Sequence, residues 1–454
     1  MSETTSAVPQ GSTGAGEFAS SSSCQVGDVF KEMPLTREHL KCCLALFFVF
    51  AIEAWEMMII VYTAPLIATD FSLDALAVGH LIGAMFIGML LGALAWGKVA
   101  ERIGRKRAII WSLGSYGVIS LASAFAPDYS TLYGLRLLSG IAAVGMMVVT
   151  FAHFQELLPV RHRGALTVYL ASGWPIGMLL ALGATVWLMP QGWRATIVLS
   201  SLGGLWAIVV ALWVPESPYW LASVGRQQAA RKVIGTLSRG TVRVPQGCEL
   251  QVDRTTLGRQ RDVFSRALLK VSLLQITVNF TFSWGYWGLQ TWLPTLLQQR
   301  GLSLPQSYGF IALSALCMIP GYIAASYLTG RFGRKKIIVG FISASVLAGY
   351  GFANAQSLEM LYLSNFALAF FSLGAWGVWG AWVGELYPTT LRTLGYGWAI
   401  FAQRVANVLA PSLIGALIAY GSSFNMTTTI INGFLLVTVV LAALMPETEG
   451  KALR

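Results

Sequence analysis

Charged residues are scarce in this sequence: they make up 11% of its 454 residues, whereas a soluble domain usually carries about a quarter. Hydrophobic residues make up 55%, and the mean hydropathy is +0.63. This composition excludes an ordinary soluble protein and predicts an integral membrane protein. In lipid, every backbone polar group must be paired internally, so only helices or closed barrels can span the bilayer. The apolar runs are about 20 residues long and do not alternate like barrel strands, which favours helices.

The sequence also lacks the residue patterns of enzymes and metal sites. Its five cysteines show no Cys-x-x-Cys or Cys/His ligand spacing, so neither a zinc site nor a disulfide framework is expected. It contains no Gly-x-Ser-x-Gly, His-Glu-x-x-His or P-loop pattern. We therefore expect no enzyme activity, no metal and no cofactor.

The basic residues that give the chain its net charge of +11 are unevenly distributed. Of 31 lysines and arginines, 27 fall in segments expected on one face of the membrane, and only Arg194 and Arg300 are expected on the other. The positive-inside rule places both termini in the cytoplasm. The positive charge thus serves to orient the chain in its bilayer, and we expect no nucleic-acid partner.

Twelve apolar segments are long enough to span a bilayer. They cover residues 42–69, 76–97, 107–126, 131–157, 164–189, 195–214, 270–296, 308–329, 335–354, 359–384, 395–420 and 428–446. The predicted fold is an all-α membrane protein with two six-helix halves, 42–214 and 270–446, joined by a polar cytoplasmic linker at 215–269. Residues 1–41 are expected to form a disordered cytoplasmic tail, and 447–454 a cytoplasmic C-tail.

Two fragments repeat one basic pattern at corresponding places in the two halves. The first basic loop, Gly97–Arg107, reads GKVAERIGRKR, and the second basic loop, Ser326–Lys336, reads SYLTGRFGRKK. A cationic loop between apolar spans, present once per half, indicates a duplicated membrane protein. Many secondary transporters are built from such repeats, with the substrate site between them.

The two basic loops resemble the paired signature of the major facilitator superfamily, Gly-x-x-x-Asp-Arg-x-Gly-Arg followed by two basic residues. Further likenesses are Arg136 with Leu-Leu-Ser-Gly-Ile after it, and the segment Glu385–Arg392. The segments that begin at Pro215 and Pro446 resemble the sugar-porter and organic-ion branches. This resemblance implies a twelve-helix transporter that works by alternating access.

Within the superfamily, the sequence around Trp292–Pro294 and Phe370–Val378 is similar to bacterial niacin permeases, which are relatives of synaptic vesicle glycoproteins and organic anion transporters. The chain departs from the superfamily signature at both basic loops. Glu101 stands where an aspartate is usual, and Ser326 and Gly330 replace the glycine and the aspartate of the second loop. We therefore expect the gating ion pair of the second half to be weaker or absent.

Charged side chains within spans are costly in lipid and usually functional. Span 1 carries Glu53 and Glu56, whose i,i+3 spacing places them on one helical face. Two neighbouring carboxylates in a low dielectric do not ionise together easily, so one is expected to carry a coupled proton. Arg136 in span 4 is a candidate for the same coupling. Alternatively, one or both acids pair with Arg136 and only hold the helices together.

Arg404 lies within span 11, and its guanidinium suits bidentate capture of a carboxylate. In organic anion transporters an arginine in the corresponding helix is implicated in anion binding, and the resemblance implies the same role here. The alternative is a buried ion pair with Glu53 or Glu56. Asn407 follows one turn later and is expected on the same face.

Spans 5, 7 and 10 contribute aromatic and amide side chains that suit a flat ring with a polar edge. The candidates to line the cavity are Trp174, Asn279, Tyr286, Trp287, Gln290 and Trp376. Other charged residues near the basic loops are expected to act in gating, through ion pairs that break as the halves move. These residues are Glu101, Arg102, Arg105, Glu156, Arg163, Arg331, Arg334, Glu385 and Arg392.

Together these features predict a proton-linked importer of a small aromatic carboxylate, nicotinate first, in the bacterial inner membrane. The chain is expected to act as a monomer. Benzoate-type symport and transport of another organic ion or a sugar remain alternatives within the superfamily. A receptor or structural protein derived from the fold is the alternative outside transport.

Overall fold

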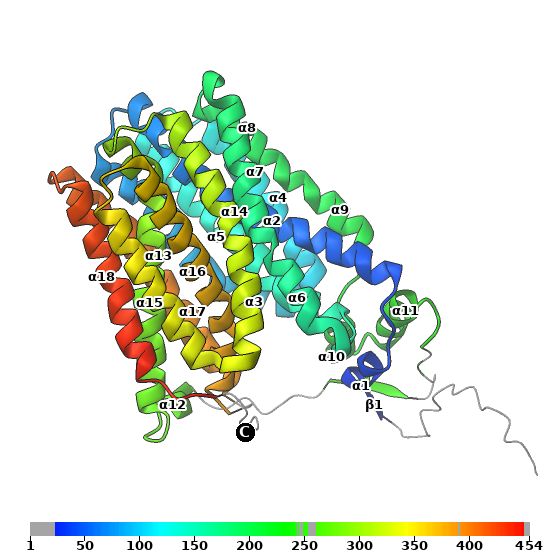
Figure 1. The fold of residues 1–454 in the computed structure, drawn as a ribbon. Helices are drawn as coiled ribbons and strands as arrows, with labels where there is room; N and C mark the ends of the chain where they lie inside the picture. The colour runs from blue at the N-terminus through cyan, green and yellow to red at the C-terminus, as the bar shows by residue number, and fades with distance from the viewer. Residues whose placement is uncertain (1–22, 243, 245–247, 253–259, 389–390, 449–454) are drawn as a thin grey trace, which may run out of the picture.

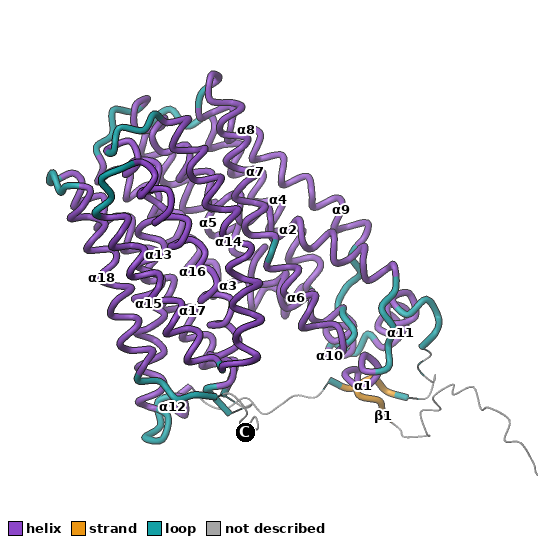
Figure 2. The backbone as a smooth tube through the Cα atoms, in the orientation of Figure 1, coloured by secondary structure: helices purple, strands orange, loops and turns teal. Residues whose placement is uncertain are grey.

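The computed structural model describes residues 23–448 apart from 243, 245–247, 253–259 and 389–390. Long helices lie side by side in one bundle (Figure 1), and connecting loops are short and gather at its ends (Figure 2). Within the described residues the only strands are two three-residue segments. The predicted all-α architecture is therefore confirmed.

The first half contains six helical units. Its helices are α2 (Arg37–Asp70), α3 (Ala75–Ile103), α4 (Arg105–Ala124), α5 (Tyr129–Leu157), α6 (Arg163–Ala171), α7 (Gly173–Leu188), α8 (Trp193–Ser201) and α9 (Trp206–Trp213). The fifth unit is interrupted at Ser172, between α6 and α7. The sixth is interrupted by the 3-10 turn η3 (Leu202–Leu205), between α8 and α9.

The second half contains six unbroken helices. They are α13 (Leu269–Gln299), α14 (Leu304–Phe332), α15 (Arg334–Ala353), α16 (Leu358–Glu385), α17 (Arg392–Ala419) and α18 (Phe424–Ala443). In the part of the chain that the structure describes, ten helical segments are long and apolar enough to cross a membrane. The two units outside that group are α4, which begins with three basic residues, and α13, which carries Gln275, Asn279 and Gln290.

Both basic loops turn at a glycine. Gly104 separates α3 from α4 with φ of 100°, and Gly333 separates α14 from α15 with φ of 91°. L residues with a side chain rarely adopt such angles, so glycine is needed at both points. We call the end of the bundle that holds these two loops the basic-loop end.

Helices that start at the opposite end are capped by short polar side chains. The Asp74 carboxylate accepts a hydrogen bond from the Ala77 amide (2.7 Å), and Asp128 accepts one from Thr131 (2.9 Å). In the second half, serine hydroxyls fill the same role before α14, α16 and α18. These caps satisfy backbone amides that would otherwise be unpaired at the membrane surface.

Within each half, one pair of helices packs backbone to backbone. A Cβ at Gly88 of α3 would collide with the Leu137 carbonyl of α5, and one at Gly321 of α14 would collide with the Phe370 carbonyl of α16. Small residues allow this approach, which drives helix association in lipid. The two pairs occupy equivalent positions in the two halves and fix the positions of the side chains that these helices carry.

The two halves meet mainly through α3 against α17 and α7 against α14. The Tyr308 hydroxyl donates a hydrogen bond to the Tyr62 carbonyl (2.5 Å), and Gly79 lies against the backbone of Pro411. All four residues lie toward the ends of their helices that are remote from the basic loops. The halves are therefore joined tightly at the end opposite the basic loops.

A small module at the basic-loop end joins the N-terminal segment to the linker. Strand β1 (Ser23–Gln25) pairs in parallel with β2 (Glu249–Gln251), beside α1 (Val26–Lys31), α10 (Pro218–Ser223) and α11 (Gln227–Leu237). Within the linker, α11 is amphipathic and buries Ala230, Ile234 and Leu237. The rest of the described linker includes a short helix, α12 (Gln260–Val263).

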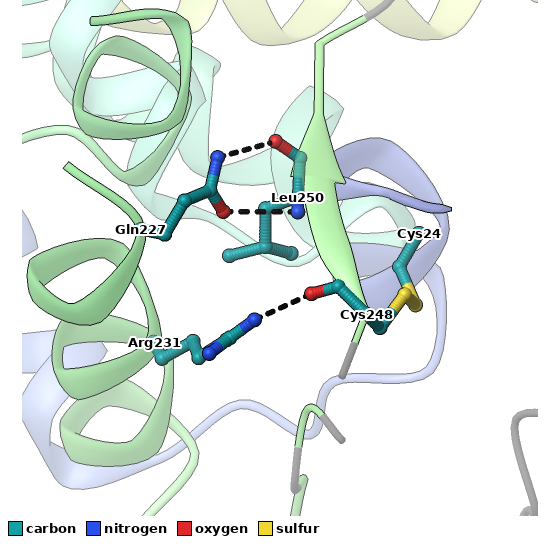
Figure 3. The surroundings of a disulfide bond; sticks show 5 residues. All are labelled: Cys24, Gln227, Arg231, Cys248 and Leu250. Carbon is teal, nitrogen blue, oxygen red and sulfur yellow. Dashed lines mark hydrogen bonds between the residues drawn. A yellow bond between two sulfur atoms is a disulfide. The ribbon is translucent and has the colours of Figure 1, made fainter. Parts of the chain in front are cut away.

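Two expectations change at this module. Residues 23–41, placed in a disordered tail from their composition, instead contain β1, α1 and the start of α2. A disulfide joins Cys24 to Cys248, although the cysteine spacing indicated no disulfide framework (Figure 3). Strand pairing brings the two cysteines together across 224 residues, and side chains of α11 hold β2: Gln227 makes two hydrogen bonds to Leu250, and Arg231 donates to the Cys248 carbonyl.

Candidate substrate site between the two halves

Glu56 belongs to an ion-pair network inside the first half. Its Oε1 accepts hydrogen bonds from Arg136 Nη1 (2.8 Å) and from the Ser139 hydroxyl (2.6 Å), and its Oε2 accepts one from Ser200 (3.3 Å). Arg136 also donates to Ser123 (2.7 Å). Glu56 and Arg136 are fully buried. This buried ion pair, with the serine hydroxyls around it, joins α2, α5 and α8, although Arg136 Nε has no hydrogen-bond partner among the described residues.

Glu53, one turn earlier on α2, has different surroundings. It is also fully buried, yet neither carboxylate oxygen has a hydrogen-bond partner among the described residues. The charge that acts on it is Arg404 of α17, across the boundary between the halves. An ionised carboxylate without partners is costly in such a place. The spacing of the two acids is therefore the same as predicted, but their chemistry differs.

Arg404 crosses from the second half toward the first. Only 7% of its side chain is exposed, and no ion pair between described residues includes it. Its guanidinium contacts two thioethers, Met147 Sδ of α5 at 3.1 Å and Met89 Sδ of α3 at 3.9 Å. Sulfur is a weak acceptor, so most of the donor capacity of this cation is unused by strong acceptors.

Aromatic rings from both halves pack against one another where the halves meet. Trp287 of α13 lies edge-on to Phe86 of α3 (ring centroids 5.2 Å apart) and to Trp174 of α7 (5.8 Å). Tyr286 is edge-on to Trp287 (5.6 Å). All four rings lie in the interior of the bundle. The predicted residues Trp174, Tyr286 and Trp287 are thus brought together, and Phe86 joins them without having been predicted.

The remaining predicted lining residues lie deeper in the second half. Tyr286 and Gln290 border an internal cavity between α13, α15, α16 and α18. Trp376 stacks on Phe282, with ring centroids 5.9 Å apart. Asn407 is almost fully buried and hydrogen-bonded to Ser283 (2.7 Å), also within this half.

Asn279 is the centre of a hydrogen-bond network that sequence reasoning did not find. Its Oδ1 accepts from Trp379 Nε1 (2.7 Å) and from Gln403 Nε2 (2.6 Å), and its Nδ2 donates to the Gln275 side chain (3.0 Å). The network joins α13, α16 and α17. Because Gln403 precedes Arg404 on α17, these bonds set how that helix is rotated and where Arg404 lies.

Two matched networks lie at the basic-loop end. In the first half Arg105 pairs with Glu156 (3.3 Å), and the Glu216 carboxylate accepts hydrogen bonds from the Arg105 and Lys106 amides (2.8 and 3.1 Å). The Pro-Glu segments are visible in the sequence as a family resemblance, but the sequence does not indicate that Glu216 contacts the start of α4. The first network therefore closes the start of α4 with one ion pair and one anionic cap.

The second network repeats this arrangement. Arg334 pairs with Glu385 (3.0 Å), the Lys335 amide donates to Glu447 (3.2 Å), and the Thr448 hydroxyl donates to Glu385 (2.6 Å). Each ion pair joins helices of the same half. Arg334–Glu385 is a different contact from the one that an aspartate at position 330 would make, so the expectation for that gating pair stays a prediction.

The other predicted gating residues have different partners. The Arg163 guanidinium donates to the Leu158 carbonyl (3.0 Å) and the Tyr219 hydroxyl (2.8 Å). Glu101 is exposed, and within the described residues no ion pair joins it to Arg163. Arg102 and Arg331 are exposed, whereas Arg392 is partly buried. The matched networks, rather than Glu101, hold the basic-loop end in this conformation.

The family that this geometry indicates is identified by comparison with known proteins. The model of the Major Facilitator Superfamily matches residues 46–353 and 310–454. The chain belongs to this superfamily. It is therefore an integral membrane transporter rather than an enzyme, as the sequence predicted.

Two curated relatives are transporters of aromatic carboxylates. The niacin transporter NiaP of Acinetobacter baylyi is 30% identical over 406 residues, which cover 88% of this chain and 92% of that protein. The gallate transporter of Pseudomonas putida is 26% identical over 395 residues, 85% of this chain and 87% of that protein. The predicted likeness to niacin permeases is thus confirmed as sequence similarity.

The fold also matches solved structures of the superfamily. The inward open conformation of the xylose transporter XylE from E. coli has a TM-score of 0.73, covering 91% of this chain and 98% of that one, at 18% identity. At this identity the likeness shows the fold alone, and it confirms the major facilitator architecture.

Proposed function

We propose that this chain imports a small aromatic carboxylate, nicotinate in the first place, by proton-coupled alternating access. The observation that carries the proposal is Arg404, a buried guanidinium at the boundary between the halves whose contacts are two thioethers. A fixed fork of N–H donors matches the two oxygens of a carboxylate, and burial strengthens the resulting charge-assisted bonds.

The aromatic cluster would recognise the other part of the substrate, its ring. A substrate whose carboxylate reaches Arg404 would place its ring near Trp287, Trp174 and Phe86, which come from both halves. Edge-to-face and offset contacts between rings favour a flat aromatic body over a sugar. The two relatives described above are a niacin and a gallate transporter, which share an aromatic carboxylate.

Proton coupling follows from counting charges at the site. Arg404 carries +1, and an ionised Glu53 carries −1, so a substrate monoanion would leave one negative charge uncompensated in the interior. A proton on Glu53 removes this excess. Glu56 does not serve this purpose, because Arg136 already neutralises it. We therefore assign the coupled proton to Glu53 and expect one proton per monoanion.

In the proposed cycle, the matched networks keep each half rigid. Each ties helices of its own half, so the halves can move against each other without breaking them. We propose that the site opens toward the basic-loop end, because the contacts that join the halves lie at the opposite end. The positive-inside rule supports a cytoplasmic place for that end and both termini. The bacterial relatives favour the bacterial inner membrane.

Uptake of radiolabelled nicotinate into proteoliposomes tests this proposal. Arg404→Ala is expected to lower kcat/KM by about a hundredfold or more, because the substrate anion loses its buried partner. Arg404→Lys keeps the charge but not the fork, so an intermediate loss is expected. Arg266→Ala, at an exposed position just before α13, is the control and should leave uptake within about twofold, the scale of a surface substitution. Equal uptake by wild type and Arg404→Ala would refute the assignment.

A panel of competitors separates the alternative substrates. Benzoate and gallate test the second candidate, another ring acid, which the gallate transporter relative favours. Nicotinamide tests the need for the carboxylate, and xylose tests sugar transport. Competition by the ring acids but not by nicotinamide or xylose is expected. A receptor derived from the fold would bind a ring acid without accumulating it.

A further inference from the structure

The acceptors that contact Arg404 are unusual for a buried guanidinium. Both are methionine sulfurs, and both come from the other half of the protein. Met89 is fully buried, whereas Met147 is half-buried. Their helices, α3 and α5, pack backbone to backbone at Gly88, so the backbones that carry the two methionines are held close together.

The chemistry of sulfur makes this contact weak. A thioether is polarisable and accepts hydrogen bonds only weakly, whereas an amide or carboxylate oxygen at the same place would accept strongly. A strong acceptor would neutralise or satisfy Arg404 and would compete with any anionic substrate. The two sulfurs instead position the guanidinium while leaving it available to a stronger acceptor.

We infer that Met147 and Met89 are positioning residues that hold Arg404 across the boundary with contacts that a carboxylate displaces. The inference rests on the proposed function, since it assumes that Arg404 binds the substrate carboxylate. It also links binding to movement. When the guanidinium turns from the sulfurs of the first half to the substrate, one contact between the halves is weakened.

The test replaces Met147 with side chains of similar size but different acceptor strength. Met147→Gln offers an amide oxygen, and Met147→Leu offers no acceptor. We expect Met147→Gln to raise the Kd for nicotinate about tenfold or more, because its oxygen competes for Arg404. Met147→Leu removes the weak acceptor without supplying a competing one, so its Kd should rise less than that of Met147→Gln, by about threefold. Met146→Gln, the buried neighbour, is the control for introducing an amide into α5.

A packing role for Met147 would give a different pattern. It predicts that Met147→Gln destabilises the protein without nicotinate, as Met146→Gln should. The inference predicts instead that Met147→Gln melts at or above the temperature of Met147→Leu, and only while Arg404 is present. This is a double-mutant cycle measured without ligand, with Arg404→Ala as the second variant. The inference would be overturned if the melting temperatures of Met147→Gln and Met147→Leu differed by the same amount with Arg404 present and with Arg404→Ala.

The two failures can be told apart. If the wild-type protein binds nicotinate and Met147→Gln binds it equally well, the inference is wrong and the proposed function stands. If the wild-type protein binds no ring acid, the proposed function is wrong, and the ligand-free cycle still decides whether Met147 holds Arg404.

Discussion

The two halves of this transporter are alike at the basic-loop end and unlike at the centre. At the basic-loop end, each half contains an equivalent ion pair. The pair is Arg105–Glu156 in the first half and Arg334–Glu385 in the second. At the centre, the first half supplies the acids and the second half supplies Arg404, while both halves supply rings. Duplication thus retained the parts that hold each half rigid, while the site between the halves became asymmetric. An asymmetric site suits a substrate with one charged end and one flat face.

Within the centre, Glu53 and Glu56 give a second comparison on a single helix. Glu56 has three hydrogen-bond donors around it, and Glu53 has none among the described residues. One turn of α2 therefore separates an acid that holds the fold from an acid available for a proton. Substitutions at these two positions test this difference most directly.

The largest expected effect is that of Glu56→Gln on stability. Removing its charge leaves Arg136 buried without a counter-ion, which costs about 3–5 kcal/mol. Thermal unfolding in detergent measures it. The double variant Glu56→Leu with Arg136→Met should recover much of the loss, because replacing a whole buried pair with apolar groups is often neutral. If Glu56→Gln melts like wild type, the pair is not what holds α2 to α5.

Glu53→Gln is expected to leave stability intact and to change coupling. A permanently neutral side chain at this position imitates the protonated state, so nicotinate binding should no longer strengthen as the pH falls. Exchange of nicotinate across the membrane should continue, while accumulation driven by a pH gradient is lost. Binding measured across pH, and uptake with and without an imposed gradient, check both. Glu53→Asp, which keeps the acid, serves as the control, and a Glu53→Gln transporter that still concentrates nicotinate would assign the proton elsewhere.

The smallest effects are expected from the matched pairs. Glu156→Gln and Glu385→Gln each remove one partner of an ion pair whose side chains are only 20–24% exposed, so a loss of about 1–3 kcal/mol is expected, less than at the fully buried Glu56 pair. Each should change the uptake rate by about two- to fivefold, and by a similar factor, since the surroundings match. A tenfold difference between the two variants would show that the halves are not equivalent at this end.

Much of the fold was accessible from the sequence. The apolar runs gave twelve spans in two groups of six because lipid forces long helices, and the repeated basic loops marked the duplication. The module at residues 23–31 was missed because a short strand pair depends on a partner more than 200 residues away along the chain. The same distance concealed the disulfide between Cys24 and Cys248.

The site was accessible only in part. Charge within a span is rare enough to single out Glu53, Glu56, Arg136 and Arg404 from the sequence. Met89 and Met147 carried no such signal, because methionine is an ordinary apolar residue in a membrane helix. Asn279 looked like a lining residue, since the sequence does not show that Trp379 and Gln403 already occupy its amide.

The sequence by itself determined that this protein lies in a membrane, that it is built twice over, and which few residues carry charge into the bilayer. These features follow from local composition, because each polar or charged residue placed in lipid has its own free-energy cost. Only the tertiary structure decided that Glu56 is neutralised while Glu53 is not, and that Arg404 faces sulfur rather than a carboxylate. Those outcomes depend on which helices become neighbours, and packing between distant parts of the chain settles that.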